Sequence, residues 1–186
     1  MAYRKKKTIL TAEEVSRTIK RMAHEIVEKN YGVKDLVIVG IQLRGVHLAN
    51  RIAGQIKNIE KKEIPVGILD ITLYRDDVDS IASQPVVKET KIPFDITDKK
   101  IILVDDVLYT GRTVRAALDE LIDFGRPKLI KLAVLIDRGN REFPIQPDFV
   151  GKLFQTSKTE LISVDLKEVD GHDEVVLKEK TEGKNE

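Results

Sequence analysis

The stretch that decides the fold is Ile101–Thr113, which reads IILVDDVLYTGRT. Its apolar start predicts a buried strand over Lys100–Val104. Asp105 and Asp106 follow at once, and adjacent carboxylates at the exit of a buried strand are costly unless they bind a partner. A glycine-containing turn then leads into an amphipathic helical pattern over Thr113–Phe124. A strand, a polar turn and a helix in this order are typical of ligand sites in parallel α/β sheets.

Short apolar runs alternate with amphipathic helical patterns on both sides of this stretch. Further strands are predicted over Leu36–Val39, Val66–Leu73 and Ile130–Ile136, with shorter candidates at Phe149–Gly151 and Leu161–Val164. Further helices are predicted from Thr11 to about Lys29 and over Val46–Ile59. This alternation predicts an α/β fold with a doubly wound, mostly parallel sheet. Ligands of such sheets bind beyond the carboxyl ends of the strands.

The first predicted helix begins with a capping-box pattern, Thr11 followed by Glu14. Its apolar stripe is Val15, Ile19, Met22, Ala23 and Ile26, and its basic stripe is Arg17, Lys20, Arg21 and His24. The apolar stripe is expected to face the core. The basic stripe is either a solvated face or a surface for a polyanion, and the pattern alone does not choose between them.

Composition narrows the function classes. The chain has 186 residues, a net charge of +1 and no cysteine, which excludes disulfides and thiolate chemistry within it. We predict a single domain over residues 1–186, a cytoplasmic protein and no membrane span. Residues 1–30 hold eight basic and four acidic side chains, and residues 160–186 hold nine acidic and four basic ones. We predict a basic tail at residues 1–8 and a frayed end at residues 178–186.

The turn after the acid pair has the chemistry of a sugar-phosphate site. Carboxylates suit the hydroxyls of a sugar, while Thr110, Thr113 and the free N–H groups of a helix start suit a phosphate. Asp105, Asp106 and the turn therefore predict a site for a ribose phosphate. The alternative is a buried strand followed by a polar turn and a threonine-capped helix. Each part of the motif alone is weak evidence for a ligand site, but the complete run of strand, acids, turn and helix favours a ribose phosphate site.

Three stretches carry a resemblance to a known family: Asp70–Asp77 (DITLYRDD), Val104–Thr113 (VDDVLYTGRT) and Asp137–Glu142 (DRGNRE). The second resembles the signature of the type I phosphoribosyltransferases. Together they resemble the PyrR family of pyrimidine operon attenuation regulators, over roughly Ile9 to Val176. The resemblance implies a type I phosphoribosyltransferase fold with a flexible lid and a small hood. It also implies an enzyme that converts uracil and phosphoribosyl pyrophosphate to UMP and pyrophosphate.

The resemblance also implies which residues form the site. The catalytic candidates are Arg44, Asp105, Asp106 and Arg138. The candidates that bind phosphoribosyl pyrophosphate or nucleotide are Gln42, Arg44, Arg75, Asp105, Asp106, Val107, Leu108, Tyr109, Thr110, Gly111, Arg112 and Thr113. Arg44 lies in an expected pyrophosphate loop after the first strand, and Arg75 lies in the lid over Tyr74–Val87. Mg²⁺ is expected to arrive with the pyrophosphate, without a dedicated all-protein cage.

The base is expected to be a pyrimidine. In 6-oxopurine enzymes of the superfamily an acid stands two residues before the glycine of the turn, and here that residue is Tyr109. Arg138 contacts the base or the pyrophosphate in this interpretation, or alternatively pairs with Asp137. Two other functions stay open: a purine salvage phosphoribosyltransferase, and a purely regulatory nucleotide sensor with a vestigial site.

A second surface is implied by the regulatory role of the family, which binds the leader mRNA of pyrimidine operons in response to UMP or UTP. The RNA-binding candidates are Arg17, Lys20, Arg21, His24, Arg141 and Lys152. Basic side chains neutralise RNA phosphates, which gives this surface its physical basis. The family resemblance also implies a homodimer or larger homo-oligomer, which would join two basic helix faces.

Overall fold

The computed structural model describes residues 3–71 and 89–181. The strands are β1 (Tyr3–Leu10), β2 (Leu36–Ile41), β3 (Val66–Leu69), β4 (Lys100–Leu108), β5 (Leu129–Asp137), β6 (Phe149–Leu153), β7 (Glu160–Asp165) and β8 (Glu174–Lys180). The helices are α1 (Ala12–Lys29), α2 (Arg44–Glu60), α3 (Arg112–Asp123) and α4 (Lys167–Asp170). Among the described residues no helix is both long and apolar enough to cross a membrane.

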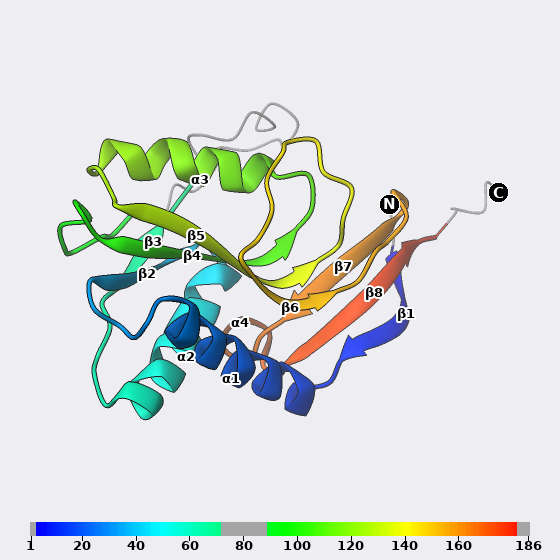
Figure 1. Cartoon of the computed structure of the whole chain (residues 1–186). Helices are drawn as coiled ribbons and strands as arrows, with labels where there is room; N and C mark the ends of the chain where they lie inside the picture. Colours follow the sequence, from blue (N-terminus) through cyan, green and yellow to red (C-terminus); the bar gives the residue numbers. More distant parts are fainter. Residues whose placement is uncertain (1–2, 72–88, 182–186) are drawn as a thin grey trace.

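The larger sheet has the strand order β3-β2-β4-β5-β6, and every pairing in it is parallel. Figure 1 shows α3 on one face of this sheet and α1 and α2 on the other. Parallel strands need crossover helices, which bury both faces of the sheet. The predicted doubly wound, mostly parallel sheet is therefore confirmed, and the carboxyl ends of β2, β4 and β5 lie at one edge.

Two apolar cores hold the sheet between its helices. One lies between the sheet and α1 and α2 and continues to the smaller sheet, while the other lies under α3. The predicted α1 stripe, Val15, Ile19, Met22, Ala23 and Ile26, is buried throughout. The predicted capping box is also present, because Thr11 N–H donates to Glu14 Oε2 at 2.8 Å and Glu14 N–H donates to Thr11 Oγ1 at 3.4 Å.

The two ends of the chain form a separate antiparallel sheet with the order β1-β8-β7, which we call the hood sheet. The predicted basic tail is wrong for residues 3–8, which belong to β1. Lys178–Lys180, predicted to fray, belong to β8, and residues 182–186 lie outside the described residues. The reason is the antiparallel pairing of β1 with β8. Ion pairs across the hood sheet accompany this pairing: Arg4 pairs with Glu179, Lys5 with Glu174 and Lys6 with Glu160.

The strand that carries the acid pair is longer than its apolar run. Its prediction ended at Val104, whereas β4 continues to Leu108 because Asp105 pairs with Val134 of β5, and Val107 pairs with Ile136. The ladder thus holds the backbone of the acid pair in extended form. β3, predicted over Val66–Leu73, ends at Leu69, and residues 72 and 73 lie outside the described residues.

Candidate functional site

The acid pair lies near the end of the ladder between β4 and β5. Asp105 is 7% exposed, and its Oδ1 accepts a hydrogen bond from Asp106 N–H at 2.9 Å. Asp106 Oδ1 accepts from Val107 N–H at 2.8 Å. Each carboxylate is thus held by the next peptide N–H. Such fixed carboxylates are suited to accept hydrogen bonds from two adjacent hydroxyl groups.

Burial raises the pKa of the Asp106 carboxyl above its ordinary value. A hydrogen bond with Asp105, the Val107 N–H and the positive charge of Arg44 act in the opposite direction. The charge of Arg44 is therefore felt at the acid pair, although the two groups come from different strand ends. A titratable group perturbed by burial and by a specific charge is typical of functional sites.

The turn after β4 forms the start of α3. Gly111 is the N-cap with φ of 92°, a left-handed conformation that side chains rarely adopt. A Cβ atom there would also lie 3.2 Å from the Phe143 Cβ. Gly111 has no side chain to cap this helix start, and the Thr110 hydroxyl accepts a hydrogen bond from the first N–H group of the helix, that of Arg112, at 3.3 Å. A helix start of this kind attracts phosphate through its N–H groups and its dipole.

The loop after β5 covers the outer side of that turn. Glu142 N–H and Phe143 N–H both donate to Thr110 O, at 2.9 and 3.0 Å. The Arg112 side chain turns toward the same loop, where its Nε donates to Glu142 Oε2 at 2.8 Å. Arg112 N–H lies 3.3 Å from Thr110 Oγ1. The loop after β5 therefore stabilises the turn. Arg112 contacts the turn through its backbone N–H, while its guanidinium contacts Glu142.

The loop after β2 lies beside the acid pair. Gly45 sits so close to β4 that a Cβ atom there would lie 2.5 Å from Val104 O and 3.3 Å from Asp105 Cα. Gln42 N–H donates to Leu69 O at 2.9 Å, which fixes the loop to β3 as well. The next residue but one, Arg44, begins α2. The structure thus brings Arg44 and the acid pair together, as the sequence predicted.

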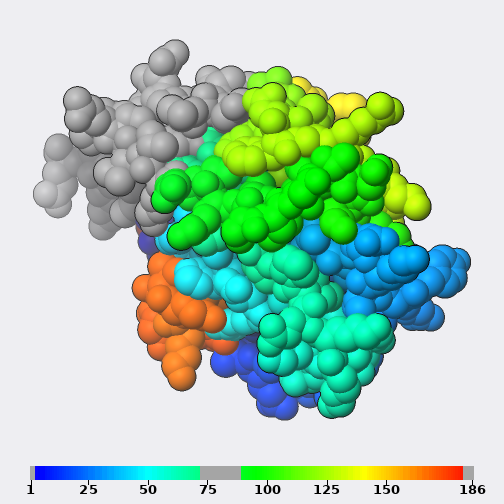
Figure 2. All heavy atoms as spheres, turned by 90° about the vertical axis from the view of Figure 1, so that its left-hand side faces the viewer, coloured from blue at the N-terminus to red at the C-terminus, as the bar shows by residue number. Residues whose placement is uncertain are grey.

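Arg44 has a partner that no sequence pattern indicates. Its Nη2 donates to Asp170 Oδ1 at 2.9 Å and its Nε to Asp170 Oδ2 at 3.3 Å. Asp170 ends α4, in the loop between β7 and β8 of the hood sheet. In Figure 2 the orange hood segment lies against the cyan start of α2. The two residues are 126 positions apart, so no local pattern links them.

Arg138 is a buried brace, not a free cation. It is 4% exposed, and burial lowers the pKa of its guanidinium. Its Nε donates to Thr156 Oγ1 at 2.8 Å, and its Nη2 donates to the carbonyls of Ser157 and Glu160 at 3.1 and 2.9 Å. It also stacks on the Tyr109 ring at 3.9 Å from the centroid. Arg138 thus fixes the Tyr109 ring, and its predicted contact with the base or the pyrophosphate stays a prediction.

The alternative pairing of Arg138 with Asp137 is wrong. Asp137 instead pairs with Arg141, whose Nη2 lies 2.6 Å from Asp137 Oδ1. Arg141 also donates to the carbonyls of Tyr109, Gly139 and Ile145. Its side chain is 15% exposed. Arg141 thus holds the loop after β5 together and fixes it to Tyr109.

Most of the other RNA candidates lie along one flank, where α1 packs beside the edge strand β6. Arg17, Lys20 and His24 are exposed on α1. Arg21 donates to Val150 O and Gly151 O at 2.9 and 2.6 Å, and Lys152 donates to Ile9 O at 3.1 Å. These bonds satisfy backbone groups at an open sheet edge. Arg141 lies apart from this flank, in the loop described above.

The remaining site predictions are distributed as follows. Val107 and Leu108 belong to the β4 ladder, and Leu108 is buried. Thr110 and Thr113 flank the start of α3 and are half-buried. Arg75 and the predicted lid over Tyr74–Val87 lie outside the described residues. Within the described ranges there is no group of three or more His, Cys, Asp or Glu side chains that is able to hold a metal ion.

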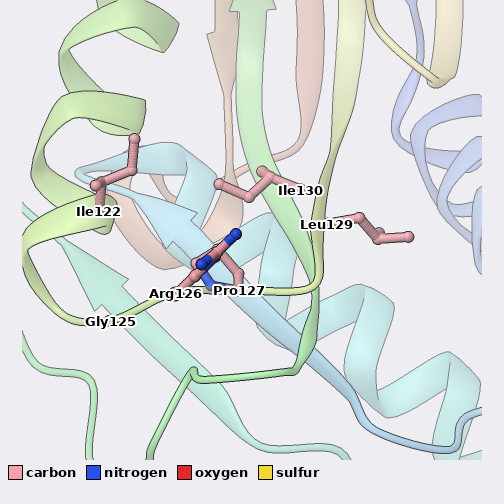
Figure 3. Close-up of a pocket in the computed structure, with 6 residues that line it drawn as sticks. All are labelled: Ile122, Gly125, Arg126, Pro127, Leu129 and Ile130. Carbon is pink, nitrogen blue, oxygen red and sulfur yellow. The ribbon is translucent and has the colours of Figure 1, made fainter.

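A separate apolar hollow lies at the opposite end of the sheet. Figure 3 shows its lining, which comes from the end of α3 and the start of β5: Ile122, Gly125, Arg126, Pro127, Leu129 and Ile130. The acid pair lies at the carboxyl end of β4, whereas this hollow lies at the amino end of β5. It is therefore not part of the candidate site.

Comparison with protein families and curated proteins gives a consistent result. Residues 5–168 match the phosphoribosyl transferase domain family. The chain is 58% identical over 179 residues to the bifunctional protein PyrR of Pelotomaculum thermopropionicum, covering 96% of this chain and 99% of that protein. It is 59% identical over 175 residues to the bifunctional protein PyrR of Thermus aquaticus, covering 94% of this chain and 97% of that protein.

Solved structures show the same fold at low identity. A hypoxanthine phosphoribosyltransferase from Staphylococcus aureus has a TM-score of 0.69 and 20% identity and covers 92% of each chain. A hypoxanthine phosphoribosyltransferase from Trypanosoma cruzi has a TM-score of 0.70 and 16% identity, with 93% of this chain and 91% of that chain covered. These similarities support the fold and leave the choice of base to the site itself.

Proposed function

The chain belongs to the phosphoribosyl transferase domain family and, within it, to the PyrR proteins, and from this membership and its site we propose a dual function. It is an RNA-binding regulator of pyrimidine biosynthesis genes that responds to pyrimidine nucleotides by transcription attenuation. It is also a uracil phosphoribosyltransferase, which converts uracil and phosphoribosyl pyrophosphate to UMP and pyrophosphate. The observation that carries this proposal is that one sheet edge joins the acid pair, the glycine turn at the start of α3 and Arg44.

Each of these groups has a place in the reaction. Asp105 and Asp106 accept hydrogen bonds from the ribose 2′ and 3′ hydroxyls, and the start of α3 binds the 5′-phosphate. Binding through the hydroxyls and the 5′-phosphate leaves the ribose C1 free to react with a nitrogen of uracil. Arg44 stabilises the negative charge that grows on the departing pyrophosphate. Binding of both ends of the sugar aligns C1 with the base, which lowers the entropic part of the barrier.

Mg²⁺ fits this site as a companion of the substrate. Mg²⁺ prefers oxygen ligands and retains several waters, so Asp105 and Asp106 would hold it together with substrate oxygens and water. Bound with the pyrophosphate, the ion supplies positive charge for the leaving group.

The base site favours uracil over a purine. Tyr109 stands where the purine enzymes have an acid, and its ring is fixed by the stacked Arg138 guanidinium. A tyrosine ring does not supply the carboxylate that a purine nitrogen requires. The alternative activity, purine salvage, requires an acid at the position of Tyr109, and this chain has none there. The other alternative, a sensor with a vestigial site, does not fit the intact acid pair.

Substitution of the acid pair tests the enzymatic half. Asp105→Asn/Asp106→Asn should lower kcat/KM with uracil at least about a hundredfold, because two charge-assisted acceptors for the ribose hydroxyls are weakened. UMP formation from uracil and phosphoribosyl pyrophosphate measures it. Asp98→Asn/Asp119→Asn is the matched control, since both acids are exposed and lie away from the site.

Three outcomes are distinguishable when uracil, hypoxanthine and guanine are supplied separately. Product from uracil alone supports the proposal. Product from a purine would establish the salvage enzyme instead. UMP binding without product from any base would establish the regulatory sensor. An acid-pair variant that still binds UMP normally would remove the ribose site from the acid pair.

For the RNA-binding half, the proposed surface is the α1–β6 flank formed by Arg17, Lys20, Arg21, His24 and Lys152. Arg141 contributes through the loop it organises, and that loop also holds Tyr109. Its substitution is therefore expected to disturb transferase activity as well as RNA binding. We further propose a homodimer or larger homo-oligomer that brings two flanks together, and light scattering would measure the assembly.

Charge removal on α1 tests the RNA surface. Arg17→Ala/Lys20→Ala should weaken binding to pyrimidine operon leader RNA about tenfold or more and reduce the salt slope by about one per lost phosphate contact. Filter binding with and without UMP or UTP measures both effects. Lys61→Ala/Lys62→Ala removes the same charge at the far end of α2 and should change little. Equal losses in both pairs would indicate a net-charge effect and contradict the proposed surface.

A further inference from the structure

Arg44 is held by the hood sheet's connecting loop rather than by its own strand end. Its guanidinium makes two hydrogen bonds with Asp170, at 2.9 and 3.3 Å. The side chains are partly exposed, 31% for Arg44 and 22% for Asp170. A two-point contact of this type fixes both the position and the plane of the guanidinium. The contact thus joins the leaving-group side of the site to a distant part of the chain.

Asp170 is itself firmly placed. Its Oδ2 accepts a hydrogen bond from Leu166 N–H at 2.8 Å, which closes the single turn of α4. The same segment is fastened to α2 further along the helix, where Arg51 donates to Glu168 and Asp173 at 2.8 Å each. Two arginines of α2 therefore hold the α4 segment against the helix. This second attachment means that α4 does not depend on Arg44 alone for its position.

Arg44 also interacts electrostatically with the acid pair, since its positive charge lowers the pKa of Asp106 while burial raises it. In the absence of substrate, a long and flexible arginine near two carboxylates is drawn toward them. Such a collapse would occupy the acceptors that the ribose hydroxyls require. Asp170 offers the guanidinium an alternative partner on the other side of the loop.

We propose that Asp170 is a positioning residue for the transferase reaction: it holds the Arg44 guanidinium ready for the pyrophosphate and away from the ribose-binding acids. This inference rests on the proposed function. A preset cation loses less freedom when the substrate binds, so affinity for the pyrophosphate group rises. The base site at Tyr109 is built by the loop after β5 and is independent of this contact.

Asp170→Asn tests the proposal, because the amide can still accept the Leu166 N–H while its charge on Arg44 is lost. The expected result is a KM for phosphoribosyl pyrophosphate raised about tenfold, with a KM for uracil changed less than about twofold. Asp170→Glu should recover most of the loss. Glu168→Gln is the matched control in the same turn, and it should leave both KM values near those of the unaltered protein.

A double-mutant cycle separates positioning from a structural role. In an Arg44→Ala background, Asp170→Asn should add almost nothing to the loss of phosphoribosyl pyrophosphate affinity. An additive loss, or an equal rise in both KM values together with a lower melting temperature, would overturn the proposal.

Calorimetric titration with pyrophosphate alone keeps this test independent of turnover. Weaker pyrophosphate binding by Asp170→Asn supports the positioning role even if no base gives product, whereas unchanged binding contradicts it. Absence of product from every base in the unaltered protein would count against the transferase activity only.

Discussion

Glu120 is a carboxylic acid on the buried side of α3, 5% exposed. Its Oε1 accepts a hydrogen bond from the Thr90 hydroxyl, which in turn accepts Asp70 N–H at 2.9 Å. Its Oε2 finds no partner among the described residues. Burial raises the pKa of Glu120, and the nearby charges of Asp70 and Asp123 act in the same direction. The ionised form is therefore unfavourable in the folded chain.

Glu120→Gln should stabilise the protein at neutral pH by about 1 kcal/mol, since it keeps an acceptor for Thr90 and removes a buried charge. A raised folded pKa means that the folded chain holds the proton more tightly than the unfolded chain. The penalty is thus present at high pH and disappears as the pH falls through the folded pKa. Melting temperatures of both proteins from pH 8 to pH 4 should converge at the acid end, and Asp119→Asn is the exposed control.

Single residues of the site differ in how far the sequence reveals them. The sequence predicts Asp105, Asp106 and Gly111 as site residues, because the strand, the acids and the turn are neighbours in the chain. The sequence also predicts Arg44 as a cation in a glycine-flanked loop. It does not predict the partner of Arg44, because Asp170 comes from the hood sheet. The structural partners of Arg138 could not be predicted, because a local pattern does not show that residues 156–160 close over its side chain.

Secondary-structure elements show the same distinction. The α1 helix is fully predicted by its own residues, since the capping box and the apolar stripe are both local. The β1 strand is not, because YRKKKTIL has no alternating pattern and becomes a strand only through β8. In β4 the apolar run predicted where the strand starts, whereas pairing with β5 decided where it ends. Elements formed by partners far along the chain escape local reasoning.

At the scale of the whole molecule, the structure explains why basic residues concentrate at the start of the chain and acidic residues at its end. The basic start and the acidic end of the chain pair with each other in the hood sheet, as Lys6 and Glu160 do at 2.9 Å. The predicted basic tail and frayed end missed this closure for residues 3–8 and Lys178–Lys180. The hood sheet in turn carries Asp170 to Arg44, so closure of the chain ends is linked to the site.

The hood sheet should loosen in acid before the larger sheet does. The hydrogen bond from Lys6 lowers the pKa of Glu160 to about 2, and bonds from Lys5 and Arg4 lower the pKa values of Glu174 and Glu179. An acid with a lowered folded pKa stabilises the fold above its unfolded value, and this contribution is lost as the pH falls through the folded value. For Glu160 that window runs from about pH 4.5 down to about pH 2.

Amide hydrogen exchange between pH 6 and pH 3 measures this loosening. Protection in β1 and β8 should fall earlier than protection in β4 and β5, because the hood sheet combines exposed ion pairs with apolar packing, whereas β4 and β5 lie between two apolar cores. Lys6→Met should remove much of the pH dependence at β7 and β8. Lys57→Met breaks a similar exposed pair with Glu63 outside the hood sheet and should leave that dependence intact. Simultaneous loss of protection in both sheets would show instead that they unfold as one cooperative unit.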